Sequence, residues 1–93
     1  MYKLVFPESY ETKASRFLRK HPEVASQYRK CLTLLELDPF HPSLRLHKFK
    51  TSNFEGYSVS INLSYRISIE FLISEKEVTL VNVGDHQDIY GKK

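Results

Sequence analysis

The feature that most constrains the fold of this chain is a change in the spacing of its apolar residues. From Ser9 to Lys20, and again after Pro22, apolar residues recur every three or four positions, which predicts two helices. From Leu46 onward they alternate with polar residues, as in strands that bury one face. A chain with this order is expected to pack a helical layer against a sheet.

Prolines and short polar runs mark the ends of these elements. His21-Pro22-Glu23 separates the two helices into a tight hairpin, and Asp38-Pro39 ends the second helix. A short strand, Tyr2–Phe6, precedes them, and four strands follow at residues 46–50, 57–61, 65–73 and 78–83. The predicted class is α+β, in the order β-α-α-β-β-β-β. It comprises an N-terminal strand, a helical hairpin and a four-stranded, mostly antiparallel sheet, in a single domain over residues 1–93.

Composition excludes several classes of protein. The single cysteine, Cys31, rules out a disulfide framework and a cysteine-based zinc cluster, and its place in an apolar helical stripe predicts a buried thiol. No His, Asp and Glu set has metal-ligand spacing, so no metal is expected. No apolar run approaches the length of a membrane span, and the N-terminus lacks the pattern of a signal peptide. The cytoplasm is therefore the expected compartment.

Charge permits a nucleic-acid partner without requiring one. The net charge is +3, and the most basic segment is Phe40–Lys50, which has two histidines and no acidic residue. The strands at 57–61 and 65–73 each have a polar face, which we expect to stay open because the apolar face packs on the helices. Its residues are Ser58, Ser60, Arg66, Ser68 and Glu70. That face is either a platform for a polyanion or the ordinary solvated side of an antiparallel sheet, and composition alone favours the second.

The order of elements and three local sequences resemble the RelE/ParE superfamily of toxins from bacterial toxin–antitoxin systems. These sequences are LHKFK (Leu46–Lys50), GYSVSINLSYRI (Gly56–Ile67) and VGDHQDIY (Val83–Tyr90). The resemblance covers essentially the whole chain and is strongest to the RelE and YafQ branch, the ribosome-dependent messenger-RNA endonucleases. It implies a metal-independent endoribonuclease without a cofactor. The implied partners are messenger RNA, the ribosome and a cognate antitoxin.

The resemblance also implies roles for individual residues. Arg66 matches an arginine that stabilises the scissile phosphate, and His86 matches the position of a catalytic histidine in the YafQ type. Tyr90 matches an aromatic residue that stacks on the substrate base or takes part in proton transfer. His47 lies near the position of another functional histidine and is a second candidate base. The implied RNA-binding residues are Arg45, Lys48 and Lys50.

These residue types suit RNA cleavage without a metal. The reaction needs a base for the 2′-hydroxyl proton, cations for the charge that grows on phosphorus, and an acid for the leaving 5′-oxygen. Histidine titrates near neutral pH, and arginine holds two phosphate oxygens at once. Each residue also has a structural alternative. His86 could cap the end of the last strand, Tyr90 could plug the core, and Arg66 could pair with Glu70, whereas His47 shares the strand face of Phe49 and not that of the lysines.

The sequence departs from RelE at two positions, since Ser58 and Ser60 stand where RelE has lysines. This departure allows two rival functions. One is a ParE-like inhibitor of DNA gyrase with no nuclease activity. The other is an inactive relative that only binds an antitoxin. Transcript cleavage after induction would separate both from the nuclease.

Overall fold

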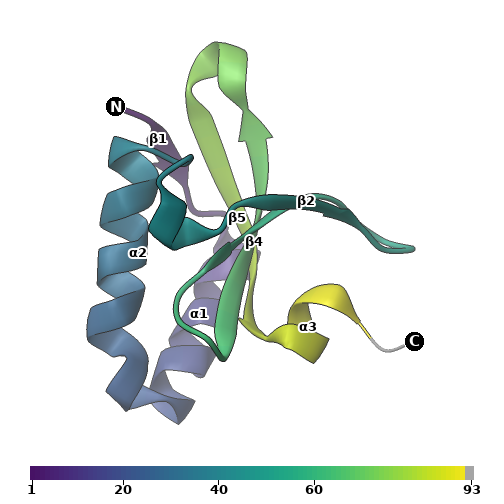
Figure 1. Ribbon diagram of the computed structural model, residues 1–93. Helices are drawn as coiled ribbons and strands as arrows, with labels where there is room; N and C mark the ends of the chain where they lie inside the picture. Colours follow the sequence, from purple (N-terminus) through teal and green to yellow (C-terminus); the bar gives the residue numbers. More distant parts are fainter. Residues whose placement is uncertain (92–93) are drawn as a thin grey trace.

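The computed structural model of the protein describes residues 1–91 and has the predicted α+β class and order of elements (Figure 1). Short 3₁₀ turns lie at Pro22–Val24, Pro42–Leu44 and Ile73–Glu75. In the part of the chain described, no helix has both the length and the apolar character of a membrane span. The helices and strands are β1 (Lys3–Val5), α1 (Glu8–Lys20), α2 (Ala25–Leu37), β2 (His47–Lys50), β3 (Glu55–Ser60), β4 (Tyr65–Leu72), β5 (Glu77–Asp85) and α3 (His86–Tyr90).

The sheet has five strands in the order β1-β5-β4-β3-β2. The predicted count of four is wrong because β1 also joins the sheet, where Lys3–Val5 runs parallel to the start of β5. The remaining pairs are antiparallel, as predicted. A separate N-terminal strand would leave its backbone N–H and C=O groups without partners, and pairing with β5 satisfies them.

The helical hairpin covers one face of the sheet, as Figure 1 shows. Tyr10 and Tyr28 link the two helices through their hydroxyls, which lie 2.7 Å apart, and burial raises the pKa of both phenols. Cys31 is buried as predicted, and burial raises the pKa of its thiol to about 12. The sheet residues that complete this core are Val59, Ile67, Ile69, Val78, Leu80 and Val83.

The opposite face of the sheet is not open, contrary to the prediction. The chain after β5 forms the short helix α3, which folds back over β4 and β5 and buries Ile89 against them (Figure 1). Ser58 and Ser68, predicted to face solvent, are 0% and 3% exposed. Sequence periodicity describes each strand separately, so it could not show that a later segment covers the polar face.

A β-bulge in β5 determines which of its residues face α3. Consecutive residues of β4 pair with Asn82 and Leu80, so Val81 is an extra residue without a cross-strand partner. As a result Leu80 and Val83 both face the core although they are three residues apart. Asn82 lies on the other side, where its amide donates to the carbonyl of Asp88 in α3 at 3.0 Å.

Candidate active site

Side chains from β2, β3, β4 and α3 meet around the hydroxyl of Ser58. His47 lies opposite Ser58 in the pairing of β2 with β3, and Arg66 extends from the neighbouring strand β4. Tyr90 reaches the same point from the end of α3. We call His47, Ser58, Arg66 and Tyr90 the Ser58 cluster. The structure thus brings together three of the four predicted catalytic residues, which are 19 to 43 positions apart in the chain.

Several hydrogen bonds hold the Arg66 guanidinium in place. Its Nε donates to the Ser58 hydroxyl at 3.0 Å, and Nη2 donates to the carbonyls of Arg45 at 2.8 Å and Ser58 at 3.2 Å. Nη2 also lies 3.3 Å from Nδ1 of His47. A guanidinium can only donate, and with one Nη2 hydrogen shared between the Ser58 carbonyl and Nδ1, this contact favours the His47 tautomer that has its lone pair on Nδ1 and its proton on Nε2. Arg66 is directed toward the cluster and not toward Glu70.

The hydroxyl of Tyr90 connects the histidine to the serine. It lies 2.9 Å from Nε2 of His47 and 2.6 Å from Oγ of Ser58. The His47 and Tyr90 rings are nearly parallel, 13° apart with centroids at 5.8 Å, and Phe49 meets the tyrosine ring edge-on at 4.7 Å. With its proton on Nε2, His47 donates to Tyr90, and Tyr90 in turn donates to Ser58. The tyrosine is therefore fixed by its hydroxyl as well as by its ring.

His86 lies beside this cluster without a hydrogen bond to it in residues 1–91. It is the first residue of α3 and is exposed, and its ring packs against that of Tyr90 with centroids 4.4 Å apart. The junction of β5 and α3 is capped by Asp85, the N-cap residue of α3, which accepts from the backbone N–H of Asp88 at 2.9 Å. This bond holds the pKa of the Asp85 carboxyl below its ordinary value. His86 is left free of a capping role.

Gly84 allows α3 to start close to the sheet. A Cβ at this position would lie 2.6 Å from the Cβ of Asp88, nearer than real Cβ contacts. The Asp88 carboxylate accepts from the backbone N–H of Asp85 at 3.0 Å, and the two acids form a capping box. This close approach places His86 and Tyr90 over the sheet.

The predicted RNA-binding residues lie around β2. Lys48 and Lys50 alternate with His47 and Phe49, which both contact Tyr90, and Lys50 at the end of the strand lines the same hollow as Tyr90. Arg45 is exposed and has a left-handed backbone, with φ of 48°. Its carbonyl, and not its side chain, anchors Arg66. In residues 1–91, no group of three or more His, Cys, Asp or Glu side chains is arranged to hold a metal ion.

Sequence reasoning missed the role of Ser58, which it treated as an open surface position and a missing lysine. The structure places its hydroxyl at the centre of the cluster and fully buries it. Ser58 pairs with another small polar residue, Ser68, in the β3–β4 register, but this pairing is seen in the structure and not in the local sequence. The Ser58 hydroxyl lies 3.0 Å from Nε of Arg66 and 2.6 Å from the hydroxyl of Tyr90, so a longer side chain here would have to displace one of them.

The arrangement of the sheet and the helical hairpin is shared with several solved structures. Solved structures with this fold include YafQ from E. coli strain BL21(DE3), with a TM-score of 0.75 at 11% identity, over 98% of this chain and 100% of that chain. YafQ in the E. coli DinJ–YafQ complex gives 0.75 at 13%, over 98% and 100%. The YoeB/ParE toxin from Agrobacterium tumefaciens gives 0.70 at 16%, over 90% and 98%. No protein-family model matches the chain, and no curated protein matches it in sequence.

Proposed function

We propose that this chain is the toxin of a toxin–antitoxin system and a metal-independent endoribonuclease that cleaves messenger RNA on the ribosome. The observation that carries the proposal is the Ser58 cluster with His86 beside it, which gathers an arginine, two histidines and a tyrosine on the face of the sheet that α3 covers. The toxin fold and the solved DinJ–YafQ complex support a cognate antitoxin as partner. Because messenger RNA on ribosomes is a cytoplasmic substrate, the proposed activity belongs in the cytoplasm.

Arg66 is proposed to bind the scissile phosphate. Its Nε and Nη2 are used within the cluster, whereas Nη1 has no hydrogen-bond partner in the described part of the chain. The fixed side of the guanidinium orients the free side, so little side-chain entropy is lost when a phosphate binds. The charge then balances the negative charge that develops on the phosphorane oxygens.

His86 and Tyr90 are proposed to move the protons. His86 accepts the proton of the 2′-hydroxyl as the 2′-oxygen bonds to phosphorus. The bond from phosphorus to the 5′-oxygen then breaks, and the Tyr90 hydroxyl gives its proton to that oxygen. The products are a 2′,3′-cyclic phosphate and a 5′-hydroxyl end. The tyrosinate that forms is stabilised by His47 Nε2–H and by Ser58, to which Arg66 Nε donates.

His86→Ala tests the assignment with little effect on the fold, because the side chain is exposed and makes no hydrogen bond in residues 1–91. Primer extension on transcripts after induction should show cleavage by the wild type and a loss of about 100-fold or more in the variant. Gln87→Ala, the exposed neighbour in α3, is the matched control and should cleave normally. Arg66→Ala should also abolish cleavage and growth arrest. Full toxicity and cleavage in both His86→Ala and Arg66→Ala would remove the nuclease assignment.

The two rival functions give different results in the same experiment. A gyrase inhibitor would cause DNA damage with transcripts intact, and an inactive relative would cause no growth arrest. Co-expression with the adjacent small open reading frame should relieve toxicity, and the two products should co-purify. If they do not co-purify, the proposed antitoxin pairing is wrong.

A further inference from the structure

We propose that a groove between α1 and α3 binds the RNA strand on one side of the cleaved bond. We call it the α1–α3 groove, and its sides are formed by Lys13, Arg16 and Lys20 of α1 together with Asn82 and Asp88. This inference rests on the proposed nuclease function, because it takes the Ser58 cluster as the place of cleavage. It adds a second binding region outside that cluster.

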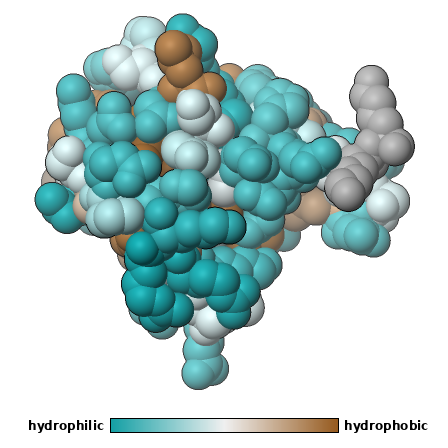
Figure 2. All heavy atoms as spheres, turned by 90° about the horizontal axis from the view of Figure 1, so that it is seen from below, coloured by the Kyte–Doolittle hydropathy of each residue, from teal (hydrophilic) through white to brown (hydrophobic). Residues whose placement is uncertain are grey.

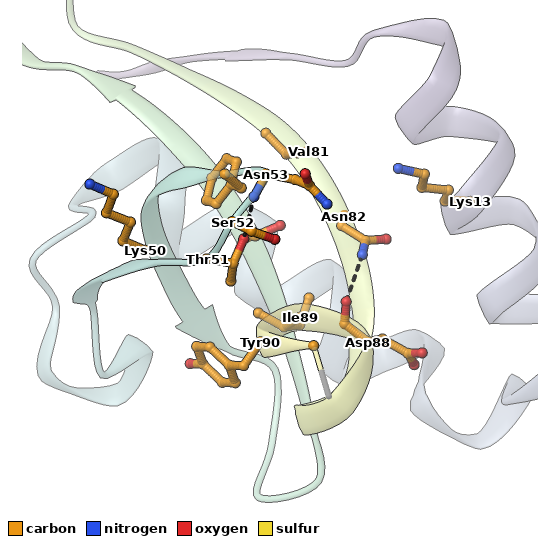
Figure 3. Close-up of a pocket in the computed structure, with 13 residues that line it drawn as sticks. Lys13, Lys50, Thr51, Ser52, Asn53, Val81, Asn82, Asp88, Ile89 and Tyr90 are labelled. Atoms are coloured by element: carbon orange, nitrogen blue, oxygen red, sulfur yellow. Dashed lines mark hydrogen bonds between the residues drawn. The ribbon is translucent and has the colours of Figure 1, made fainter. Parts of the chain in front are cut away.

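Two adjoining hollows make a continuous path from the cluster to the end of α1. The larger, about 810 Å³, is lined by Tyr90 and Lys50 at one end. The smaller, about 320 Å³, is lined by Arg16 and Lys20. Both share Lys13, Asn82 and Asp88, and Figure 3 shows Lys13 on α1 across from the other two. A strand whose cleaved bond lies at the Tyr90 hydroxyl would therefore enter the groove directly.

The helical side of the groove is a row of positive charge. Lys13, Arg16 and Lys20 follow the i, i+3, i+7 spacing of one helix face and span about 10 Å along the axis. All three are exposed, and the structure gives them no ion-pair partner within residues 1–91. Among the described residues, Asp88 is the only acid that lines either hollow, and it is already an acceptor for the backbone N–H of Asp85. The row is therefore free to bind phosphates.

The remaining lining residues include polar groups that can form hydrogen bonds with single-stranded RNA, beside apolar residues such as Phe54 and Phe17. Asn53 and Asn82 place amide groups in the larger hollow, and Ser68 adds a hydroxyl at its base. His21 also lines the smaller hollow, with a quarter of its side chain exposed and its ring packed against Phe17 and Tyr65. A protein helix bound here would need an apolar stripe along the groove against which to bury its own apolar face. Figure 2, which views the molecule from below, shows a mostly hydrophilic face with only isolated apolar patches.

The test compares short and long RNA. A trinucleotide reaches only the Ser58 cluster, whereas a strand of about twelve nucleotides can also fill the groove. Both are made with 2′-O-methyl groups so that they are not cut, and binding is measured by fluorescence anisotropy over a range of salt. The test variant is Lys13→Glu/Arg16→Glu. The control, Arg19→Glu, makes the same kind of charge change on the same helix, outside the groove and beside Glu8 and Glu11.

We expect the double variant to bind the long strand about tenfold or more weakly. The slope of log affinity against log salt should fall by about 0.7 for each phosphate that the variant no longer neutralises. Trinucleotide affinity should stay unchanged, and Arg19→Glu should leave both affinities unchanged. Unfolding by urea verifies that each protein is folded. Lys13→Gln/Arg16→Gln, which adds no negative charge, should give a smaller loss in the same direction.

Several results would overturn the proposal. Unchanged binding of the long strand by the double variant is one. Another is a loss of log affinity in Arg19→Glu that is half as large as in the double variant, because Arg19→Glu changes the charge by half as much and the loss would then follow from long-range charge alone. Weaker affinity for the antitoxin with normal RNA binding would assign the groove to a protein partner. Failure of the proposed function looks different: the wild type would cut no transcript, yet the length-dependent binding and its loss in the double variant would remain.

Discussion

The bond between Ser58 and Tyr90 gives a quantitative test of the candidate site. Ser58→Ala removes a fully buried hydroxyl that receives the Arg66 Nε proton at 3.0 Å and contacts the Tyr90 hydroxyl at 2.6 Å. A hydrogen bond from a charged group contributes about 1.5–3 kcal/mol, and one between neutral groups about 0.5–1.5 kcal/mol. Because Ser58 itself is fully buried, water cannot replace the lost partner, and Ser58→Ala should lower the free energy of unfolding by about 2–4 kcal/mol.

Tyr90→Phe and the double variant complete a mutant cycle. Tyr90→Phe removes the bonds of the hydroxyl to Ser58 and His47, and should cost about 1–3 kcal/mol. Because either single variant already removes the bond between Ser58 and Tyr90, the double variant should be less destabilised than the sum by about 1 kcal/mol. Urea unfolding followed by circular dichroism measures all four proteins.

Ser60→Ala is the control for this cycle. Ser60 is two residues away on the same face of β3, but its hydroxyl donates to the carbonyl of Asn62 at 2.7 Å and does not touch the cluster. Combined with Tyr90→Phe it should be additive within about 0.5 kcal/mol. Additivity of Ser58→Ala with Tyr90→Phe would refute the reasoning, because it would mean that the 2.6 Å contact does not stabilise the placement of α3.

Three further predictions concern the surroundings of the site. Gly84→Ala forces a Cβ into Asp88, and should lower the unfolding free energy by about 1–3 kcal/mol in urea and impair transcript cleavage. The pKa of Asp85 is lowered in the folded protein, so its cap should stabilise α3 at pH values above the ordinary carboxyl pKa and weaken as the pH falls through the pKa of the folded state. Urea midpoints measured against pH should show this dependence in the wild type, and Asp85→Asn should flatten it. Cys31, with a pKa of about 12, should react with a thiol reagent at pH 8 only after unfolding.

The sequence was sufficient to predict the fold class and the order of its elements, because those depend on local periodicity. The helical spacing before Leu37 and the alternation after Leu46 are properties of each segment by itself. The buried side of β4, with Ile67 and Ile69, followed from alternation in the same way. The place of β1 in the sheet did not, since pairing with Glu77–Thr79 joins segments at opposite ends of the chain.

The candidate residues were predicted from short sequences, but their arrangement was decided by tertiary structure. No local pattern shows that α3 folds back to bring the Tyr90 hydroxyl to His47, 43 positions away. The fold-back of α3 depends on Gly84 and on the capping box of Asp85. These residues set the direction of the chain after β5 and do not change the spacing of its apolar residues. The same fold-back buries Ser58 and turns an expected surface serine into the centre of the polar cluster. Sequence determined which groups are present, and long-range packing determined which of them can act together, because hydrogen bonds require atoms to be near in space and not in the chain.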